Sequence, residues 1–163
     1  MNTSFKVPVM WTEKVKTAWC DYNDHLNMAY YVLIFDHATD IFHESIGLDK
    51  TYRQTADCST FAVETHTNYL SEVRDGDQVC VTTQLLDQNE KCLHYFHRMF
   101  HSEKHYLAAT TEIMTVHVDL SARKVVPMPD RIQEAATNLW LQHSVLDAPK
   151  QQGHKIGIKK KLD

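Results

Sequence analysis

A polar, turn-forming run at residues 21–27 lies between a strand-like segment and a long apolar segment, and this junction constrains the fold most strongly. Its sequence, Asp-Tyr-Asn-Asp-His-Leu-Asn, places carboxylates, amides and an imidazole within a few positions. A helix that begins directly afterwards would present free backbone N–H groups and the positive end of its dipole to anything bound there. The run therefore predicts a chemical site at a helix start, suited to stabilising an oxyanion.

The segment from Met28 to about Ile46 predicts a long helix. Apolar residues recur there at helical spacing, at Met28, Tyr31, Val32, Phe35, Ala38, Phe42 and Ile46. Asn27 is expected to cap the helix and Gly47 to end it. Further apolar residues widen the apolar face, so we expect this helix to be buried on most sides and wrapped by a sheet.

Four later segments predict strands because they are rich in Val, Thr, Phe, Tyr and Leu: residues 60–73, 78–86, 92–101 and 107–120. Residues 11–19 predict an earlier strand with one wet face. Short polar turns at 74–77, 87–90 and 102–104 suit connections between antiparallel neighbours. The expected order is a strand, a long helix and a four-strand antiparallel meander, an α+β fold.

The end of the chain predicts a second helix and a basic tail. After Pro127 and Pro129, residues 130–143 have a helical pattern, and we expect this helix to pack on the outside. The expected organisation is an N-terminal segment (1–10), one domain (11–128), a C-terminal helix (129–146) and a flexible tail (147–163). The tail lysines Lys155, Lys159, Lys160 and Lys161 are expected to be solvated, with a phosphate contact as the alternative.

Composition limits the functional classes. A chain of 163 residues with 43% hydrophobic residues is large enough for one well-packed domain. Its net charge of −4 gives no overall attraction to nucleic acid. No apolar run is long enough to span a membrane, and no leader is recognisable, so we expect a cytoplasmic protein. The four cysteines are widely scattered, which predicts reduced thiols.

The run at residues 19–27, followed by Phe-Asp-His-Ala-Thr-Asp at 35–40, resembles the hotdog-fold acyl-CoA thioesterases of the hydroxybenzoyl-CoA thioesterase type. Within that superfamily it resembles the betainyl-CoA thioesterases of carnitine breakdown most closely. Later segments agree, namely residues 63–66, 81–86, 93–100 and 117–119. The resemblance covers roughly residues 9–128. One departure is Asp24, where many relatives carry glycine.

The resemblance implies thioester hydrolysis, which needs a nucleophile at the carbonyl carbon and donors for the oxygen that becomes negative. An amide such as that of Asn23 cannot act as base or nucleophile, so the carboxylate candidates are Asp21, Asp24 and Glu64. We expect Glu64 to activate water or to attack directly. Asn23 would position the water or the thioester, and His25 would orient the loop.

Backbone N–H groups near Asn27 and Met28 would polarise the carbonyl. Each of these assignments has a structural alternative. Asp21 and Asn27 suit turn and cap positions, and His25 suits a loop anchor. Glu64 suits the solvent-facing side of a strand. The eleven histidines show no zinc-like spacing, so we expect no metal site.

A betainyl group is a quaternary ammonium, which aromatic faces hold through cation–π attraction. Candidates for substrate contact are Trp19, Tyr22, Asp24, Tyr30, Tyr31 and Phe61, although aromatics are also ordinary core residues. Arg74, Lys91 and Arg98 are candidates for coenzyme A phosphates, with solvated surface charge as the alternative.

We expect acyl-CoA as the substrate and no cofactor beyond the coenzyme A that it carries. The resemblance further implies a homodimer or homotetramer with neither nucleic acid nor membrane as partner. The site would combine the loop at Asp21 with Glu64 of the same chain or of a neighbouring copy. Two alternatives remain open: hydrolysis of an aromatic or medium-chain acyl-CoA, and a non-catalytic hotdog protein that binds acyl-CoA.

Overall fold

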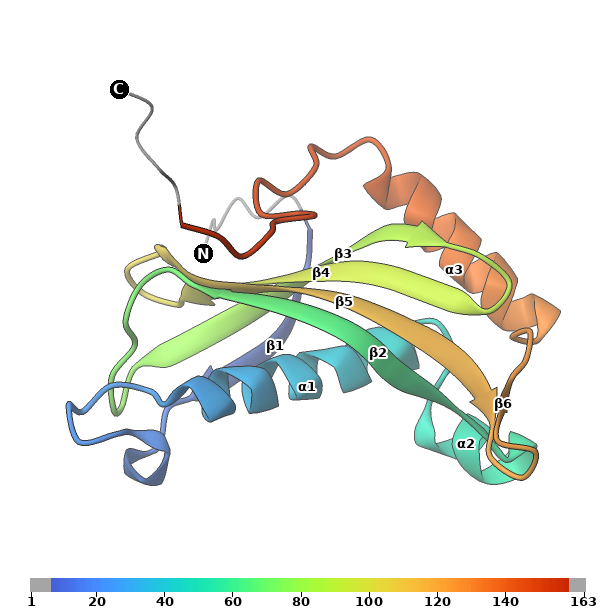
Figure 1. The fold of residues 1–163 in the computed structure, drawn as a ribbon, viewed down its shortest axis with the longest axis horizontal. Helices are drawn as coiled ribbons and strands as arrows, with labels where there is room; N and C mark the ends of the chain where they lie inside the picture. Colours follow the sequence, from blue (N-terminus) through green and yellow to red (C-terminus); the bar gives the residue numbers. More distant parts are fainter. Residues whose placement is uncertain (1–6, 159–163) are drawn as a thin grey trace.

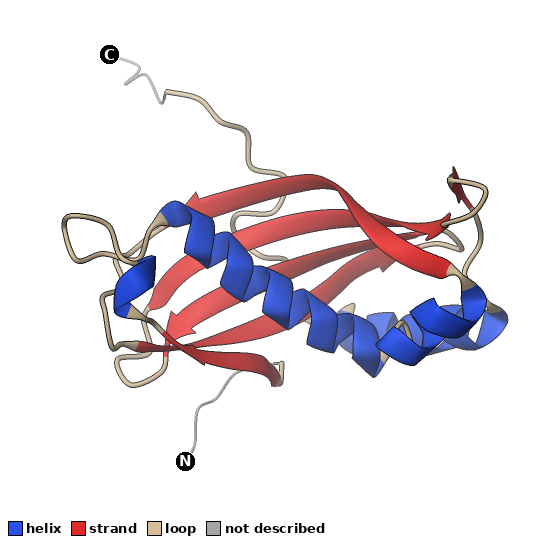
Figure 2. Ribbon diagram, turned by 90° about the horizontal axis from the view of Figure 1, so that it is seen from below, coloured by secondary structure: helices blue, strands red, loops and turns tan. Residues whose placement is uncertain are grey.

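The computed structural model describes residues 7–158, in which a long helix lies across the concave face of a curved antiparallel sheet (Figure 1). The strands are β1 (Val9–Lys14), β2 (Cys58–Tyr69), β3 (Gln78–Gln88), β4 (Cys92–His101), β5 (Leu107–Asp119) and β6 (Lys124–Val125). The helices are α1 (Met28–Ser45), α2 (Lys50–Ala56) and α3 (Asp130–His143), with a short 3-10 helix at Thr17–Trp19. Figure 2 shows α1 crossing the sheet diagonally, the hotdog architecture expected from the sequence. The predictions for Lys159, Lys160 and Lys161 lie outside the described residues.

Helix α1 begins and ends almost where the sequence predicts. The Asn27 side chain accepts a hydrogen bond from the Ala29 N–H at 3.0 Å, and Gly47 takes a left-handed conformation with φ of 88°. One side of α1 packs on the sheet, whereas Met28 and Val32 are 65% and 51% exposed. The expectation of burial on most sides is therefore wrong for the single chain. No helix among residues 7–158 has the length and apolar character needed to cross a membrane.

The prediction of a four-strand meander is wrong for its first strand, β2, which does not pair with β3. Strands β3, β4 and β5 form a meander, but β2 pairs with β5 at the far edge of the sheet. Strand β1 takes the place beside β3. The segment at residues 70–77, named here the crossing connection, is long enough to pass from β2 to β3 across the open end of the sheet. It contacts the start of α1, where the Leu26 N–H donates to the Val73 carbonyl at 2.8 Å.

Several short elements differ from the expectation. The strand expected at 11–19 ends at Lys14, and a 3-10 helix follows at Thr17–Trp19. The sequence does not predict helix α2, because its seven residues show little apolar periodicity. Its cap is the Asp49 side chain, which accepts from the Tyr52 N–H at 2.7 Å. Strand β6, of two residues, also went unpredicted.

Helix α3 spans the predicted residues and lies outside the sheet, as expected. It covers the part of β3 that β1 leaves open, because the β1 pairing ends at Thr82. The Leu85 N–H donates to Nδ1 of His143 at 2.9 Å, and the Trp140 indole donates to the Leu86 carbonyl at 3.1 Å. Burial lowers the pKa of His143, which keeps the ring neutral and able to accept. Thus α3 satisfies backbone groups that would otherwise form an open sheet edge.

Candidate functional site

The junction loop (residues 19–28) is held in one conformation by its own hydrogen bonds. The Asp21 N–H donates to the His25 carbonyl at 2.8 Å, and the Asp24 N–H donates to the Asp21 carbonyl at 3.1 Å. Oδ1 of Asp21 accepts from the backbone N–H groups of Asn23 at 2.8 Å and His25 at 3.3 Å. No hydrogen bond to its Oδ2 comes from any described residue, so this oxygen is available to a water molecule.

Asp24 has a backbone φ of 61°, in the left-handed region that favours glycine. Aspartate is one of the few other residues that adopts this conformation readily. The left-handed conformation is one that both glycine and aspartate adopt, so the aspartate at this position fits the turn. The Asp24 side chain is exposed.

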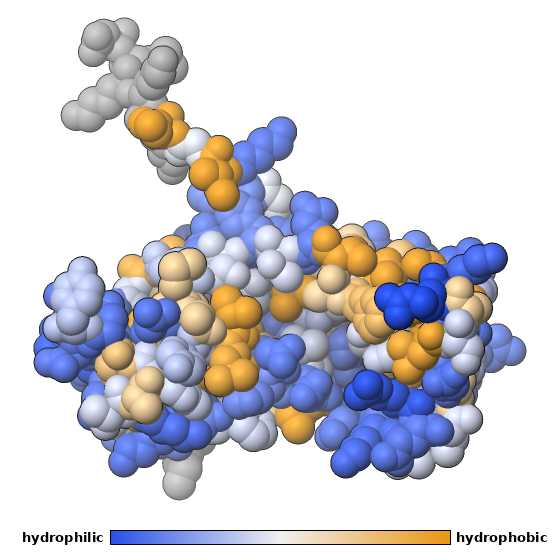
Figure 3. All heavy atoms as spheres, turned by 60° about the horizontal axis from the view of Figure 1, so that its bottom comes forward, coloured by the Kyte–Doolittle hydropathy of each residue, from blue (hydrophilic) through white to orange (hydrophobic). Residues whose placement is uncertain are grey.

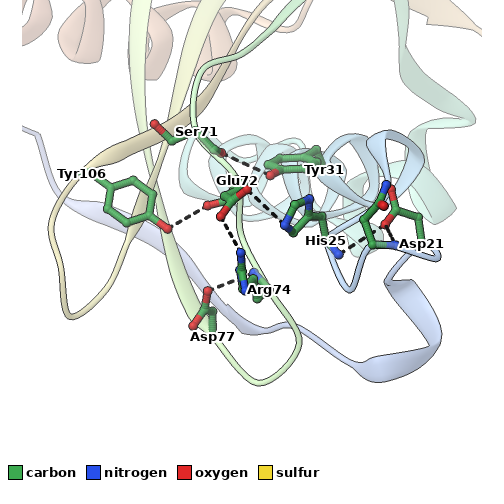
Figure 4. A network of polar contacts seen from close by, with 9 residues as sticks. Asp21, His25, Tyr31, Ser71, Glu72, Arg74, Asp77 and Tyr106 are labelled. Carbon is green, nitrogen blue, oxygen red and sulfur yellow. Dashed lines mark hydrogen bonds and ion pairs between the residues drawn. The ribbon is translucent and has the colours of Figure 1, made fainter.

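A polar network fixes the junction loop to the crossing connection (Figure 4). Nε2 of His25 lies 3.0 Å from Oε2 of Glu72, and Oε1 of Glu72 accepts from Arg74 at 2.8 Å. The Tyr106 hydroxyl donates to the Glu72 carbonyl at 2.8 Å. The hydrogen bond from Arg74, together with the nearby His25, lowers the pKa of Glu72. His25 therefore anchors the loop, and its partner Glu72 was missed because it lies in a segment predicted as strand.

The two residues predicted to offer backbone N–H groups to an oxyanion differ in hydrogen bonding. The Asn27 N–H donates to the Trp19 carbonyl at 2.9 Å, so it is occupied. The Ala29 N–H is held by the Asn27 side chain, and the Tyr30 N–H donates to the Asn27 carbonyl. The Met28 N–H has no hydrogen-bond partner in the part of the chain that the structure describes. The first turn of α1 thus leaves the Met28 N–H open to a carbonyl oxygen.

The predicted aromatic contacts lie in three environments. Trp19 and Tyr30 stack beside the junction loop with ring centroids 5.4 Å apart, and the Lys16 ammonium lies 4.2 Å from the Trp19 ring centroid. Tyr31 is buried, and burial raises its pKa to about 12. Tyr22, at the loop tip, is 94% exposed. The Trp19 ring therefore already contacts Tyr30 and Lys16 of its own chain.

Glu64 lies on the opposite side of the sheet from α1. Thr60, Ala62, Thr65 and Thr67 of β2 line a cavity against α1. The register against β5 shifts between Ala62 and Glu64, so a β-bulge at this point reverses the alternation of side chains. Regular alternation would have placed Glu64 on the same side as Ala62. The bulge directs Glu64 away from the junction loop of its own chain, so within one chain Asp21 is the carboxylate at the loop.

Two further observations support this placement. The His66 ring, on the same side of β2 as Glu64, contacts His154 of the C-terminal segment at 6.2 Å between centroids. Glu64 also precedes Tyr69, the β2 residue that hydrogen-bonds the Met28 carbonyl. At about 3.3 Å per residue the two positions are roughly 16 Å apart along the strand. Phe61 of β2, 48% exposed, is similarly remote from the junction loop.

The three predicted phosphate contacts do not meet in one chain. Arg74 lies in the crossing connection, where it pairs with Glu72. Lys91 lies beyond the other end of β3 and pairs with Glu90 at 3.1 Å. Arg98 is partly buried, donates to Gln84 at 2.8 Å, and has its pKa lowered by burial. Of the three, only Arg74 is near the junction loop.

A cavity of about 230 Å³ between α1 and strands β2 and β5 was not predicted. Two carboxylates from successive turns of α1, Asp36 and Asp40, line it together with Tyr95 and His43. Burial, and then the Asp36 charge, raise the pKa of Asp40. The spacing of the two aspartates on an apolar helix is a signal that could have identified this wall of the cavity.

Two histidines of β4 have partners other than metals. His97 lies between the hydroxyls of Thr39, at 2.9 Å, and Thr83, at 2.8 Å. His94 pairs with Glu112 at 2.7 Å. Across residues 7–158 no three His, Cys, Asp or Glu side chains are grouped as metal ligands would be.

Residues 15–136 match the model of the thioesterase-like superfamily. The chain belongs to this superfamily. The match covers the junction loop, α1 and the whole sheet after β1, and it assigns the chain to the thioesterase class of enzymes predicted from the sequence.

Two curated relatives of this thioesterase-like chain carry related names. The betainyl-CoA thioesterase of Pseudomonas aeruginosa is 35% identical over 96% of this chain and 94% of its own length. The L-carnitine dehydrogenase/betainyl-CoA thioesterase of Rhizobium meliloti is 36% identical over 90% of this chain. The match covers 29% of that longer protein.

Solved structures agree with the hotdog fold. A hypothetical protein from Staphylococcus aureus, solved in complex with CoA, has a TM-score of 0.87 and 29% identity, with 97% of this chain and 100% of the other covered. A thioesterase described as putative, from Pseudomonas putida, has a TM-score of 0.82 and 33% identity, with 94% and 98% covered.

Proposed function

We propose that this protein hydrolyses betainyl-CoA to glycine betaine and coenzyme A. The observation that carries the proposal is the P. aeruginosa betainyl-CoA thioesterase, similar over nearly the full length of both chains. The thioesterase-like family and the open Met28 N–H at the start of α1 support the reaction class. The proposal also places the enzyme in the cytoplasm, where its four free cysteines would stay reduced.

The junction loop supplies the groups that the reaction needs. The free oxygen of Asp21 takes a proton from water as the water oxygen attacks the thioester carbonyl carbon. The Met28 N–H stabilises the oxyanion that forms. When the tetrahedral intermediate collapses, the carbon–sulfur bond breaks, and the leaving coenzyme A thiolate takes up the proton that Asp21 removed from water. The products are the carboxylic acid and the thiol, and no other cofactor enters the balance.

We further propose that two copies pair through β2. This strand has twelve residues and forms one edge of the sheet, so its outer backbone groups have no strand partner among the described residues. Phe61 and Val63 on β2, and Val32 on α1, are about half exposed. Figure 3 shows hydrophobic patches between polar residues on the side that α1 occupies. Such a mixed surface suits an interface between copies. A monomer by light scattering would contradict this.

The test is thiol release from a panel of acyl-CoA esters, followed with a thiol-reactive dye. The panel compares betainyl-CoA with acetyl-, butyryl-, palmitoyl- and hydroxybenzoyl-CoA. The highest kcat/KM is expected for betainyl-CoA. Faster release from an uncharged ester would overturn the betainyl assignment and retain the thioesterase. Binding of the esters without thiol release would favour an acyl-CoA-binding protein.

A further inference from the structure

A second cavity lies between the C-terminal end of α1, helix α2 and the start of β2, which meet at one end of the sheet (Figure 1). Its volume is about 370 Å³, within the roughly 300–1,000 Å³ of sites that hold small molecules. Cys58, the first residue of β2, contributes a free and partly exposed thiol to its wall. The cavity is therefore a place where a small molecule can reach a nucleophilic sulfur.

The Tyr52 hydroxyl connects this thiol to a histidine. Tyr52 of α2 lines the cavity and is buried, and its Oη atom lies 2.8 Å from Nε2 of His117. Burial, and then the neighbouring Cys58 thiol, raise the pKa of Tyr52 to about 12. The phenol therefore keeps its proton at pH 7, and it can receive one proton as it passes another on.

His117 can take up a proton because its other ring nitrogen is already fixed. Nδ1 of His117 lies 3.0 Å from the Val126 carbonyl, which can only accept, so Nδ1 carries the ring hydrogen. Nε2 then has a free lone pair and accepts from the Tyr52 hydroxyl. A proton can thus move from the Cys58 sulfur to the Tyr52 oxygen as the phenolic proton moves to His117. The thiolate that remains is the reactive form of cysteine.

One buried polar atom at this cavity has no partner. His43 of α1 is 7% exposed and lines the wall. Its Nδ1 atom pairs with the Thr60 hydroxyl at 3.3 Å, whereas its Nε2 atom has no hydrogen-bond partner among residues 7–158. Burial lowers the pKa of His43 to about 4, so the ring is neutral at pH 7. Buried polar atoms without partners are rare in folded proteins, and a bound molecule with an amide group would supply the missing hydrogen bond.

The other three cysteines lack this arrangement. Burial, and then the Asp75 charge, raise the pKa of Cys20. Cys80 is buried, and burial raises its pKa. Cys92 is partly exposed, and its sulfur has no hydrogen bond to a side chain within residues 7–158. Of the four cysteines, all of which lie in the described part of the chain, Cys58 alone has a route for its proton.

We propose that Cys58 is a modification site that exchanges with small disulfides carrying amide groups, and that His43 pairs with such an amide. The Cys58 thiolate attacks one sulfur of the disulfide, a new sulfur–sulfur bond forms, and the other half leaves as a thiolate. The leaving thiolate takes up the proton held by His117. One disulfide is consumed and one is formed, so the incoming disulfide is the only oxidant. The modification goes beyond the proposed hydrolysis and does not depend on it.

The experiment incubates the native protein at pH 7 with oxidised glutathione or with coenzyme A disulfide, both of which carry amide groups. Peptide mass spectrometry locates the mixed disulfide and follows its formation. Modification of Cys58 is expected at least about tenfold faster than that of Cys20 or Cys92, because exchange follows the supply of thiolate. Dimethyl disulfide has no amide, so it should show a smaller preference for Cys58 over Cys92. An equal preference with all three disulfides would contradict the role of His43.

Three variants test the proton route. Cys58→Ser should abolish the fast modification, whereas Cys92→Ser, the matched control, should leave its rate unchanged. Tyr52→Phe removes the hydroxyl and should slow the modification of Cys58 about tenfold, because the thiol proton loses its acceptor. Unfolding caused by this substitution would expose Cys58 and speed the reaction. The direction of the change therefore separates a lost proton route from lost structure.

Three results would overturn the proposal. The first is modification of Cys20 or Cys92 as fast as that of Cys58 in the native protein. The second is a Tyr52→Phe variant that reacts at the native rate or faster. The third is a native protein that resists both amide-bearing disulfides under conditions in which the urea-unfolded chain reacts.

Discussion

Nε2 of His25 lies 3.0 Å from Oε2 of Glu72, and this contact joins the junction loop to the crossing connection. The same carboxylate accepts from Arg74, so three side chains fix the position of the loop. Glu72 touches no reacting atom in the proposed chemistry; it acts by holding His25. The loop geometry therefore depends on a residue nearly fifty positions away in the sequence.

Glu72→Gln should lower kcat roughly 10–100-fold, since small displacements of catalytic groups have effects of that size. The fold should be retained, because Glu72 is exposed and belongs to no core cluster. Thiol release and thermal unfolding measure the two effects. Glu90→Gln, an exposed carboxylate paired with Lys91, is the control and should behave as the native protein. Unchanged kcat in Glu72→Gln would show that the network does not position the loop.

Asp21→Asn should lower kcat at least a hundredfold, because the amide cannot take a proton from water. Its Oδ1 can still accept the loop hydrogen bonds from Asn23 and His25. Glu64→Gln should change kcat less than about threefold, since the bulge in β2 turns that side chain from α1. Single-turnover thiol release with both variants decides between the two carboxylates. The reverse order of effects would restore the Glu64 hypothesis.

Asn27→Ala should reduce the free energy of unfolding by about 1 kcal/mol, the usual cost of losing an N-cap. The cap is the 3.0 Å hydrogen bond from the Ala29 N–H. Asn27→Ser should restore most of the loss, because serine caps helices as well as asparagine does. Urea unfolding monitored by circular dichroism measures both variants. Equal stability of the alanine variant would mean that the cap contributes nothing here.

Acid should destabilise the fold before its carboxylates are protonated. Burial lowers the pKa of His43 from 6.5 to about 4, and burial together with His43 lowers that of His97 to about 3. Between pH 6.5 and these values the unfolded chain binds protons that the folded chain excludes. Stability is therefore complete above about pH 6.5 and falls as the pH drops, by about 1.4 kcal/mol per pH unit for each histidine.

Unfolding in urea at pH 7, 6 and 5 tests this slope. His97→Asn should remove the part of it that comes from one buried histidine, about 1.4 kcal/mol per pH unit. His154→Gln, which changes an exposed histidine, should leave it unaltered. A stability that is constant between pH 7 and 5 would contradict the neutral state of the two buried rings.

Asp40→Asn should raise the free energy of unfolding at pH 7 by about 0.2–0.5 kcal/mol, the size of a like-charge pair on one helix face. Burial and the Asp36 charge raise the pKa of Asp40, so its ionised form is disfavoured in the folded chain. The gain should vanish below about pH 4, where the carboxyl is protonated in both states. Matched urea titrations of the native protein and the variant measure the difference. A less stable variant at pH 7 would indicate an unrecognised partner of Asp40.

The sequence predicted those elements whose local signals are strong. The ends of α1 follow from Asn27 and Gly47, and α3 follows from a single amphipathic pattern. The place of β2 did not follow, because strand order depends on long-range pairing that no local pattern encodes. The bulge between Ala62 and Glu64 also has no sequence signal, and it alone decides which side of the sheet Glu64 faces. The sequence predicted the junction loop from its cluster of polar residues. It did not predict the contact between His25 and Glu72, because the two residues are far apart along the chain.

The two edges of the sheet differ in whether they can pair with the sheet of another copy. On one edge β1 is short and bulged, and α3 occupies the rest of β3. On the other edge β2 offers twelve residues of backbone to a neighbour. In the proposed dimer both copies contribute the same edge, β2, to the contact. Neither copy then keeps a free β2 edge, so this contact cannot continue into a fibre. Loss of α3 would expose part of β3 as a second open edge, and this edge would let the proposed dimers associate further.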